Sequence, residues 1–492
     1  MPLIIYTIYF TLSKSPVRNI RLKQNVFVLR PWANLVLFYI FKIFIYEKSI
    51  MSFIKKTLYI SLMLGLLLAG CTSYTPMPLN KKNLNKASSF ISLKKDPALY
   101  YKVVYRKPLN LDELAKVAVL NNKALKVYRD SAGIANAQIL KARTIPNPRL
   151  SLDAARPIMG NIAGAYDPYD IIPSVNIGFL FSRNANIKGA ELHAEAMHLE
   201  IAYKEWLTAE RAKLDAVRLL FLQDVIKNYN DELYSYKNSY MLIKLLFNKG
   251  LATLTELDTA RANLQKAETN LLNINKSIKD TRVKLNILLG LPPSYKLSVS
   301  NIKFKIVIPS ELKIDKDIQY RLDLEAFKIA YKAQEERLRV AILSQFPKIS
   351  VSVPFSSDNA NIQTIGLGVS LSIPLFNRNQ AGIAKETATR KQMFDDYINR
   401  LQTAKSNINA ILYNINNLKR QIALTGKQIK NLEISFKSYK KEFKSREIGV
   451  FEFYTLKNNL LNERIKLLTL MESFYNSIVS LEVVSGKTII KS

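Results

Sequence analysis

Few residues in this chain of 492 could do chemistry. The only histidines, His193 and His198, are five residues apart, so they lack the i,i+4 spacing that puts two metal ligands on one helix face. The sequence has no glycine-rich phosphate loop and no nucleophile elbow. It therefore predicts no catalytic residue, no metal site and no cofactor.

The only cysteine, Cys71, ends a segment typical of a secretory signal. Residues 51–56 are basic, and residues 57–68 form an apolar run of twelve, too short to cross a bilayer. The next residues complete a Leu-Ala-Gly-Cys ending that resembles a bacterial lipobox, in which the cysteine becomes the lipid-bearing N-terminus. We expect lipidation of Cys71 after removal of residues 51–70; the alternative is a buried thiol in a core helix.

The segments around this signal are then assigned by elimination. Residues 1–50 are apolar and aromatic without a cleavage pattern, so we interpret them as an annotation extension before a true start at Met51. Thr72 after the cysteine, where an aspartate would favour retention at the inner membrane, favours delivery to the outer membrane. Residues 71–108 are polar and are expected to form an extended tether.

The net charge of +33 raises the question of a nucleic-acid partner. The lysines are scattered among Asn, Gln and Glu along helical segments rather than gathered in one patch. This pattern predicts a solvated helix surface and no nucleic-acid binding.

The sequence contains one structural unit twice. Residues 180–184, Leu-Phe-Ser-Arg-Asn, return at 375–379 as Leu-Phe-Asn-Arg-Asn. Residues 148–152 match 347–351, and the turn at Gly250 matches the turn at Gly449, both at an offset of 199. We expect a first repeat over 109–293, an equatorial connector over 294–315 and a second repeat over 316–486.

Each repeat contains two segments with the alternation of a β-strand. The alternating apolar residues are Ile349, Val351, Val353 and Phe355, then Ile365, Leu367, Val369, Leu371 and Ile373, and more weakly Leu150, Leu152, Val175, Ile177, Phe179 and Phe181. One apolar and one small polar face fit a membrane barrel; the alternative is a half-buried hairpin in a soluble sandwich. Four strands cannot close a barrel, so several chains would have to share one.

Long helices follow the strands. Asn110 and Glu113 predict a capped helix that runs to about Arg143. From Gln380 to about Lys444, apolar residues step by three and four over more than six heptads, with a polar break at Thr425. A less regular helix is expected from 184 to 247, and return helices should end near Gly290 and Gly486, with Gly250 and Gly449 in left-handed turns. The fold class is mainly α with a small β part, in two repeats.

This order of elements resembles the TolC-type outer-membrane efflux family over residues 109–486. Residues 372–380, Ser-Ile-Pro-Leu-Phe-Asn-Arg-Asn-Gln, most closely resemble the branch that serves heavy-metal pumps. The resemblance implies a homotrimer with a twelve-stranded barrel in outer-membrane lipid and a periplasmic helical tunnel. It also implies a periplasmic adaptor and an inner-membrane pump of the RND type, which supplies the energy.

The resemblance also implies roles for single residues. The residues expected at the adaptor-contacting hairpin tips are Gly250, Leu251, Leu254, Gly449, Val450 and Phe453. Family members often carry an acidic gate residue six positions after the tip glycine. That position holds Glu256 in the first repeat and Thr455 in the second, so we expect one gate carboxylate per chain; the alternative is a carboxylate that only stabilises its helix start.

The repeated Leu-Phe-x-Arg-Asn segments are expected at the joints between barrel and tunnel. The joint residues are Arg183, Asn184, Pro374, Arg378 and Asn379. We expect the two arginines to donate hydrogen bonds to main-chain carbonyls rather than to contact cargo.

The leading hypothesis is therefore the exit duct of a tripartite efflux system, and the protein is not expected to be an enzyme. Two alternatives stay open: a lipid-anchored coiled-coil spacer or adhesin without a pore, and the duct of a type I secretion system. The chain has no Met or His cluster that would bind metal directly, and the sequence does not identify the cargo.

Overall fold

The computed structural model describes residues 74–80, 90–160, 164–300, 305–306, 318 and 321–491. The chain divides into two units, Met1–Ser88 and Ser89–Ser492, and every described helix and strand lies in the second. Residues 1–50, the expected signal and Cys71 lie outside the described residues, as does much of the expected connector at 294–315.

The second unit opens with short helices: η1 (Phe90–Lys95), α5 (Pro97–Val104), α6 (Leu111–Asn121) and α7 (Lys123–Arg143). The expectation of an extended tether is wrong for residues 90–104. They are helical because Leu93, Leu99 and Val103 are buried in the main hydrophobic core.

The capping box of Asn110 and Glu113 is confirmed at the start of α6. The expected single helix is nevertheless divided in two. Asn122 has extended backbone angles, ends α6 and caps α7 through its side chain, which accepts from the Leu125 N–H.

Four antiparallel strands form the main sheet. They are β1 (Arg149–Ala154), β2 (Tyr169–Asn176), β4 (Lys348–Ser352) continued by β5 (Phe355–Ser357), and β6 (Gln363–Ile365) continued by β7 (Gly368–Ser372). Segments β4 and β5 pair with β2 in one register, and β7 and β6 pair with β4 and β5 in one register. The order is β1, β2, β4/β5, β6/β7, with β1 and β6/β7 at the two edges.

The second-repeat strands were expected to be continuous, but each is interrupted once. Pro354 has no N–H to donate, and its carbonyl accepts from Gly366 instead. The Val353 N–H donates to the Pro173 carbonyl, so the register survives the interruption.

The strand registers align most apolar positions on one face of the sheet; Ile172, opposite Ser151, lies on the other. Val175 lies opposite Val351, which lies opposite Val369, and Ile171, Phe355 and Ile365 form a second such row. The other face carries Ser174, Ser352, Ser350 and Ser370. Among the described elements no helix covers the apolar face, which contradicts a buried sandwich and agrees with a membrane strand pattern.

Phe179 and Phe181 were expected to continue the second strand, but both belong to a helix. Asn176 ends β2, and its side chain accepts from the Gly178 N–H. This local turn redirects the chain into α8 (Phe179–Asn248), which begins three residues later.

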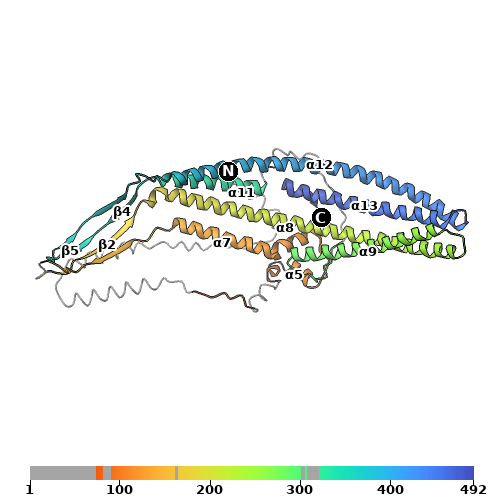
Figure 1. Ribbon diagram of the computed structural model, residues 1–492, viewed down its shortest axis with the longest axis horizontal. Helices are drawn as coiled ribbons and strands as arrows, with labels where there is room; N and C mark the ends of the chain where they lie inside the picture. Colours follow the sequence, from red (N-terminus) through yellow and green to blue (C-terminus); the bar gives the residue numbers. More distant parts are fainter. Residues whose placement is uncertain are drawn as a thin grey trace. The chain divides into compact units, whose positions relative to one another are not determined.

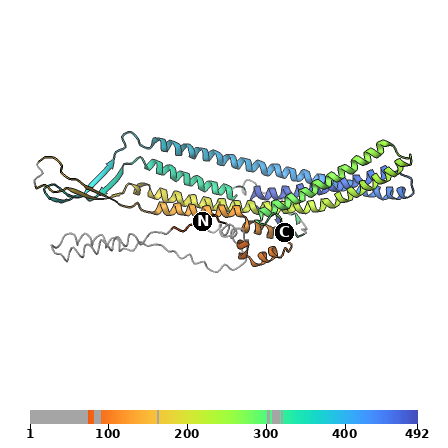
Figure 2. The same ribbon diagram turned by 60° about the horizontal axis from the view of Figure 1, so that its bottom comes forward.

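Long helices make up most of the second unit (Figures 1 and 2). They are α8, α9 (Leu254–Leu288), α11 (Leu322–Leu343), α12 (Gln380–Lys444) and α13 (Val450–Ser485). Helix α8 packs against α6, α7, α9, α11 and α13, whereas α12 packs against α11 and α13. At about 1.5 Å per residue, the 70 residues of α8 extend about 105 Å. The short strands β3 (Lys305–Ile306) and β8 (Ile490–Lys491) pair separately.

The heptad seam of α12 is confirmed, because Ala404, Ile408, Ile415 and Leu418 are buried. Thr425 does not break it. Its side chain is 5% exposed and keeps the three–four spacing between the preceding apolar residues and buried Ile429. Helix α13 is long and apolar enough to cross a membrane, but its apolar residues, among them Ile478, are packed in the core.

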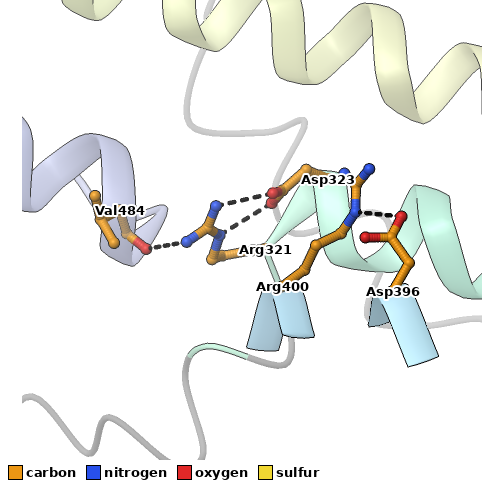
Figure 3. Close-up of polar contacts among 5 residues, drawn as sticks. All are labelled: Arg321, Asp323, Asp396, Arg400 and Val484. Atoms are coloured by element: carbon orange, nitrogen blue, oxygen red, sulfur yellow. Dashed lines mark hydrogen bonds and ion pairs between the residues drawn. The ribbon is translucent and has the colours of Figure 1, made fainter. Parts of the chain in front are cut away.

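Two junctions join helices end to end. In the first repeat, Asn122 Nδ2 donates to the Leu288 carbonyl at the end of α9, and Asn121 Nδ2 donates to the next two carbonyls. In the second repeat, Arg321 before α11 donates to the Val484 carbonyl near the end of α13 (Figure 3). Asp323 holds the Arg321 guanidinium with two bonds of 2.8 and 2.9 Å. Each junction thus continues a return helix into the shorter helix of its repeat.

Candidate functional site: the hairpin turns and the helix–sheet joint

The two hairpin turns have the same backbone geometry. After α8, the Gly250 N–H donates to the Phe247 carbonyl and the Leu251 N–H to the Leu246 carbonyl. After α12, Arg446 and Glu447 make the same bonds to Phe443 and Glu442. The equivalent positions therefore differ by 196 residues, not by the 199 of the matching glycines.

The left-handed residues of the turns are Gly250, with φ 70°, and Arg446, with φ 65°. The expected left-handed turn at Gly449 is wrong, because that residue has φ −75° and is the N-cap of α13. Its true equivalent is Thr253, the N-cap of α9. Matching the two glycines therefore predicts the wrong pair of equivalent positions. In the second turn an arginine, not a glycine, has the strained left-handed backbone.

Each turn carries one carboxylate at the third position of the following helix. Glu256 Oε2 accepts from the Thr253 N–H at 2.8 Å and from the Thr253 hydroxyl at 2.9 Å. Glu452 Oε2 accepts from the Gly449 N–H at 3.4 Å. Hydrogen bonds from the backbone and side chain of Thr253 lower the pKa of Glu256, so this group is ionised at neutral pH.

Thr455 is therefore not the counterpart of Glu256. It lies one turn further along α13, donates to the Phe451 carbonyl at 2.7 Å and lines a small hollow between α8, α9 and α13. The equivalent residue is Glu452, so each chain has two carboxylates that cap the helices after its turns. The two capping patterns, Thr253-x-x-Glu256 and Gly449-x-x-Glu452, were the sequence signal that could have shown this.

The expected tip residues differ in exposure. Leu251 and Leu254 are 71% and 59% exposed. Val450 packs against the cluster of Ile243, Leu257 and Ala260, and Phe453 is buried with its ring stacked 4.4 Å from that of Phe443. The structure thus places Leu251 and Leu254 on the surface, while Phe453 holds α12 and α13 together.

Above the turns, the interior of α8, α9 and α13 is polar. Glu232, Ser235 and Asn458 are each at most 4% exposed, and Glu232 Oε2, Ser235 Oγ and Asn458 Oδ1 have no hydrogen-bond partner. Such groups destabilise a packed interior, by about 1–3 kcal/mol each in other proteins. The lower bundle is therefore less firmly packed than the aliphatic seam of α12.

We expect Glu232→Gln to stabilise the protein at pH 7 by about 1 kcal/mol. Burial raises the pKa of Glu232, and Lys266 on α9 opposes this only in part. The pKa of Glu232 is thus higher in the folded than in the unfolded protein. The protonated carboxyl contributes its full stability below the unfolded-state pKa, and this contribution is lost as pH rises through the folded-state pKa.

The amide cannot ionise, so the gain should disappear when thermal unfolding is measured near pH 4. A gain of equal size at both pH values would contradict a buried, ionising carboxyl. Glu268→Gln, at an exposed position on α9, is the matched control and should change little.

The prediction that both joint arginines donate hydrogen bonds to main-chain carbonyls is confirmed. Arg183 Nη2 donates to the carbonyl of Arg143, the last residue of α7, at 3.1 Å. Arg378 Nε donates to the Pro374 carbonyl at 3.4 Å, within its own loop. Asn184 is exposed in the first turns of α8.

Asn379 is the counterpart of Arg183. Its side chain binds a carbonyl near the end of α11, as that of Arg183 does at the end of α7. Its Nδ2 donates to the Ala341 carbonyl at 2.9 Å, and its own backbone is left-handed, with φ 59°. A Cβ on Gly382 would overlap the Asn379 amide, so this glycine makes room for it. Asn379 lies 196 positions after Arg183, the same offset as between the two turns. This is one more than the offset between the two arginines of the repeated motif.

His193 and His198 both lie on α8. Burial and the neighbouring Arg337 lower the pKa of His193, so its ring is neutral at pH 7. In the part of the chain that the structure describes, no group of three or more His, Cys, Asp or Glu side chains could hold a metal ion.

Comparison with known proteins agrees with this architecture. The family model described as "Outer membrane efflux protein" matches residues 114–291 and 314–487. The chain is 20% identical to the cobalt-zinc-cadmium resistance protein CzcC of Cupriavidus metallidurans, over 77% of this chain and 90% of that protein. It is 22% identical to the pyoverdine export outer membrane protein OpmQ of Pseudomonas putida, over 68% and 77% of the two chains.

Among solved structures, that of CusC, described in terms of folding and transmembrane channel formation, superposes with a TM-score of 0.64. The superposition covers 77% of this chain and 92% of CusC at 18% identity. The sheet beyond the joint and the two helical hairpins therefore form a fold shared with a solved channel.

Proposed function

The chain belongs to the outer membrane efflux protein family, and we propose that three copies of it form one exit duct served by a pump of the RND type. As a member of this family it is a channel rather than an enzyme, acts in the outer membrane and extends into the periplasm. Channels of the family are trimers that work with a periplasmic adaptor and an inner-membrane pump. For this chain we propose the assembly, the adaptor contact and the class of cargo as follows.

The observation that carries the proposal is the four-stranded sheet with two open edges. Its apolar face is exposed, and its edge strands β1 and β7 have unpaired outer sides within the chain. Unpaired edges cannot persist in hydrocarbon, and four strands are too few to close. Three copies with β1 of one chain against β7 of the next would remove every edge and give twelve strands.

The assembly is tested by the native mass of the purified full chain in detergent. The proposal expects a mass of three chains with their bound detergent. A monomer or dimer that still inserts into bilayers would overturn the shared barrel.

We propose that the adaptor contacts the turns through Gly250, Leu251 and Leu254 of the first hairpin and through Arg446, Gly449 and Val450 of the second. The exposed leucines beside a rigid, hydrogen-bonded turn favour such a contact. We also keep Cys71 as the proposed lipid anchor, on the sequence pattern alone.

For cargo, we propose a small solute rather than a protein. The relatives named above are a cobalt-zinc-cadmium resistance protein and a pyoverdine export protein. Both names favour a small solute over the protein cargo of a type I system, and CzcC together with CusC favours an RND pump.

The carboxylates Glu256 and Glu452 are proposed as the selectivity ring at the periplasmic entrance. Two per chain give six in a trimer, and a ring of carboxylates favours cations in a pore. Replacing both by glutamine keeps the capping geometry, which glutamine also supports, and removes only the charge.

We expect E256Q/E452Q to reduce the cation-over-anion permeability ratio several-fold, measured as the reversal potential of single channels in a salt gradient. Glu268→Gln, further along α9, removes one exposed carboxylate from outside the turn and should leave the ratio unchanged. An unchanged reversal potential in the double variant would remove these residues from the gate.

A further inference from the structure

A hollow of about 680 Å³ lies where four helices end beside the sheet. Its walls come from the end of α7, the first turns of α8, the end of α11 and the first turns of α12, which run side by side in both views (Figures 1 and 2). The volume is that of a site for a small organic ligand.

The lining of this hollow is strongly basic. It includes Lys141, Arg183, Arg337 and Lys385 against a single carboxylate, Glu386. Lys385 lies 3.5 Å from Glu386, which also accepts a bond of 2.6 Å from Gln334. Within the part of the chain that the structure describes, Lys141, Arg183 and Arg337 form no ion pair.

Three cations just outside the hollow are, in contrast, ion-paired. Lys188 lies 2.8 Å and Arg339 3.3 Å from the buried carboxylate of Glu336. Arg143 pairs with Glu191. Three of the four cations that line the hollow therefore lack an ion pair, whereas these three neighbours each have one.

The helix ends add to the positive field. Helices α8 and α12 both begin at the hollow, and neither has an acidic residue in its first turn or a side-chain cap. The positive ends of two long helices thus remain available. The opposing carbonyl ends of α7 and α11 are occupied by Arg183 and Asn379.

The rest of the lining mixes apolar residues, Phe179, Val340 and Ala142 among them, with the polar side chains of Gln138, Thr144 and Asn186. His193 adds a neutral ring with hydrogen-bonding nitrogens, since burial and the neighbouring Arg337 lower its pKa. A ligand that fits both properties has an anionic group for the cations and an apolar portion for the walls.

We propose that this hollow binds an amphipathic anion, with its phosphate or carboxylate group between Arg337 and Lys141. The anion can come from the headgroup of an acidic lipid or from a soluble solute. This site is separate from the entrance carboxylates, and binding to it does not require that the protein conduct.

The test is calorimetric titration of the purified full chain in neutral detergent. The probes are inorganic phosphate and dioctanoyl phosphatidylglycerol, with zwitterionic dioctanoyl phosphatidylcholine as the control lipid. We expect saturable binding of at least one anionic probe that weakens as salt is raised. Binding of the acidic lipid alone identifies a headgroup site, and binding of phosphate as well identifies a site open to soluble anions.

The variant K141Q/R337Q should weaken that binding at least tenfold, since it removes two charge-assisted contacts to the anion. The matched control K227Q/K276Q removes two exposed charges elsewhere on α8 and α9 and should bind normally. If the double glutamine variant assembles poorly, K141R/R337K retains the charges and should retain binding. The proposal is overturned if neither anionic probe binds, or if K141Q/R337Q assembles normally and binds as the wild type does.

Discussion

Replacing Val351 by arginine is expected to prevent stable insertion of the sheet into a bilayer. Val351 lies between Val175 and Val369 on the uncovered apolar face, so its side chain would meet lipid. An arginine on the lipid face of a barrel costs about 2–4 kcal/mol at the midplane, and a trimer would carry three. The measurement is the fraction of protein that floats with liposomes and resists extraction by urea.

The control is Ser350→Arg, one residue away on the polar face between Asn176 and Ser370. It adds the same side chain in the same strand but should leave insertion nearly unchanged. Equal loss in both variants, or loss only at Ser350, would contradict the assignment of the two faces.

Replacing Gly290 by alanine is expected to destabilise the protein by about 3 kcal/mol or more. Gly290 has φ 66°, and an added Cβ would overlap the Asn121 carbonyl oxygen. That position lies at the junction where Asn121 and Asn122 bind the last carbonyls of α9. The alanine would therefore strain the backbone and push apart the two helices that meet there.

Thermal unfolding of G290A should show a clearly lower midpoint than the wild type. Gly133→Ala is the matched control, since Gly133 lies within α7 with open space around its missing Cβ. There alanine should be neutral or stabilising by up to about 1 kcal/mol. A G290A protein as stable as G133A would show that the end-to-end junction contributes little.

These junctions explain how the two repeats of the chain form long, continuous rods of helix. Each repeat contributes one uninterrupted long helix, α8 or α12, and one interrupted rod made of a return helix and a shorter helix. The interrupted rods are held by Asn122 in one repeat and Arg321 in the other, at positions 199 apart. Both side chains satisfy carbonyls that a helix end leaves without partners.

Features that depend on local periodicity could be predicted from the sequence. The helix Gln380–Lys444 and its buried seam follow from a spacing that any long helix must obey, and the strand faces follow from strict alternation. Thr425 was misjudged because its hydroxyl was counted as polar, although its methyl-bearing side chain fits a seam position.

Features that depend on matching the two repeats were predicted less well. Glycine identity placed the second turn at Gly449, whereas the left-handed residue is Arg446, and so Glu452 was missed as the partner of Glu256. The two junctions at Asn122 and Arg321 could not be predicted, since each joins residues more than 160 positions apart. The basic hollow likewise collects residues from both repeats.

Single-channel recording of the purified protein in a planar bilayer tests most directly whether this chain forms a conducting duct. We expect discrete conductance steps in the wild type and, with reduced cation selectivity, in E256Q/E452Q. The absence of any conductance from inserted trimers, in the wild type and in the turn variant alike, would contradict the account and favour a spacer without a pore.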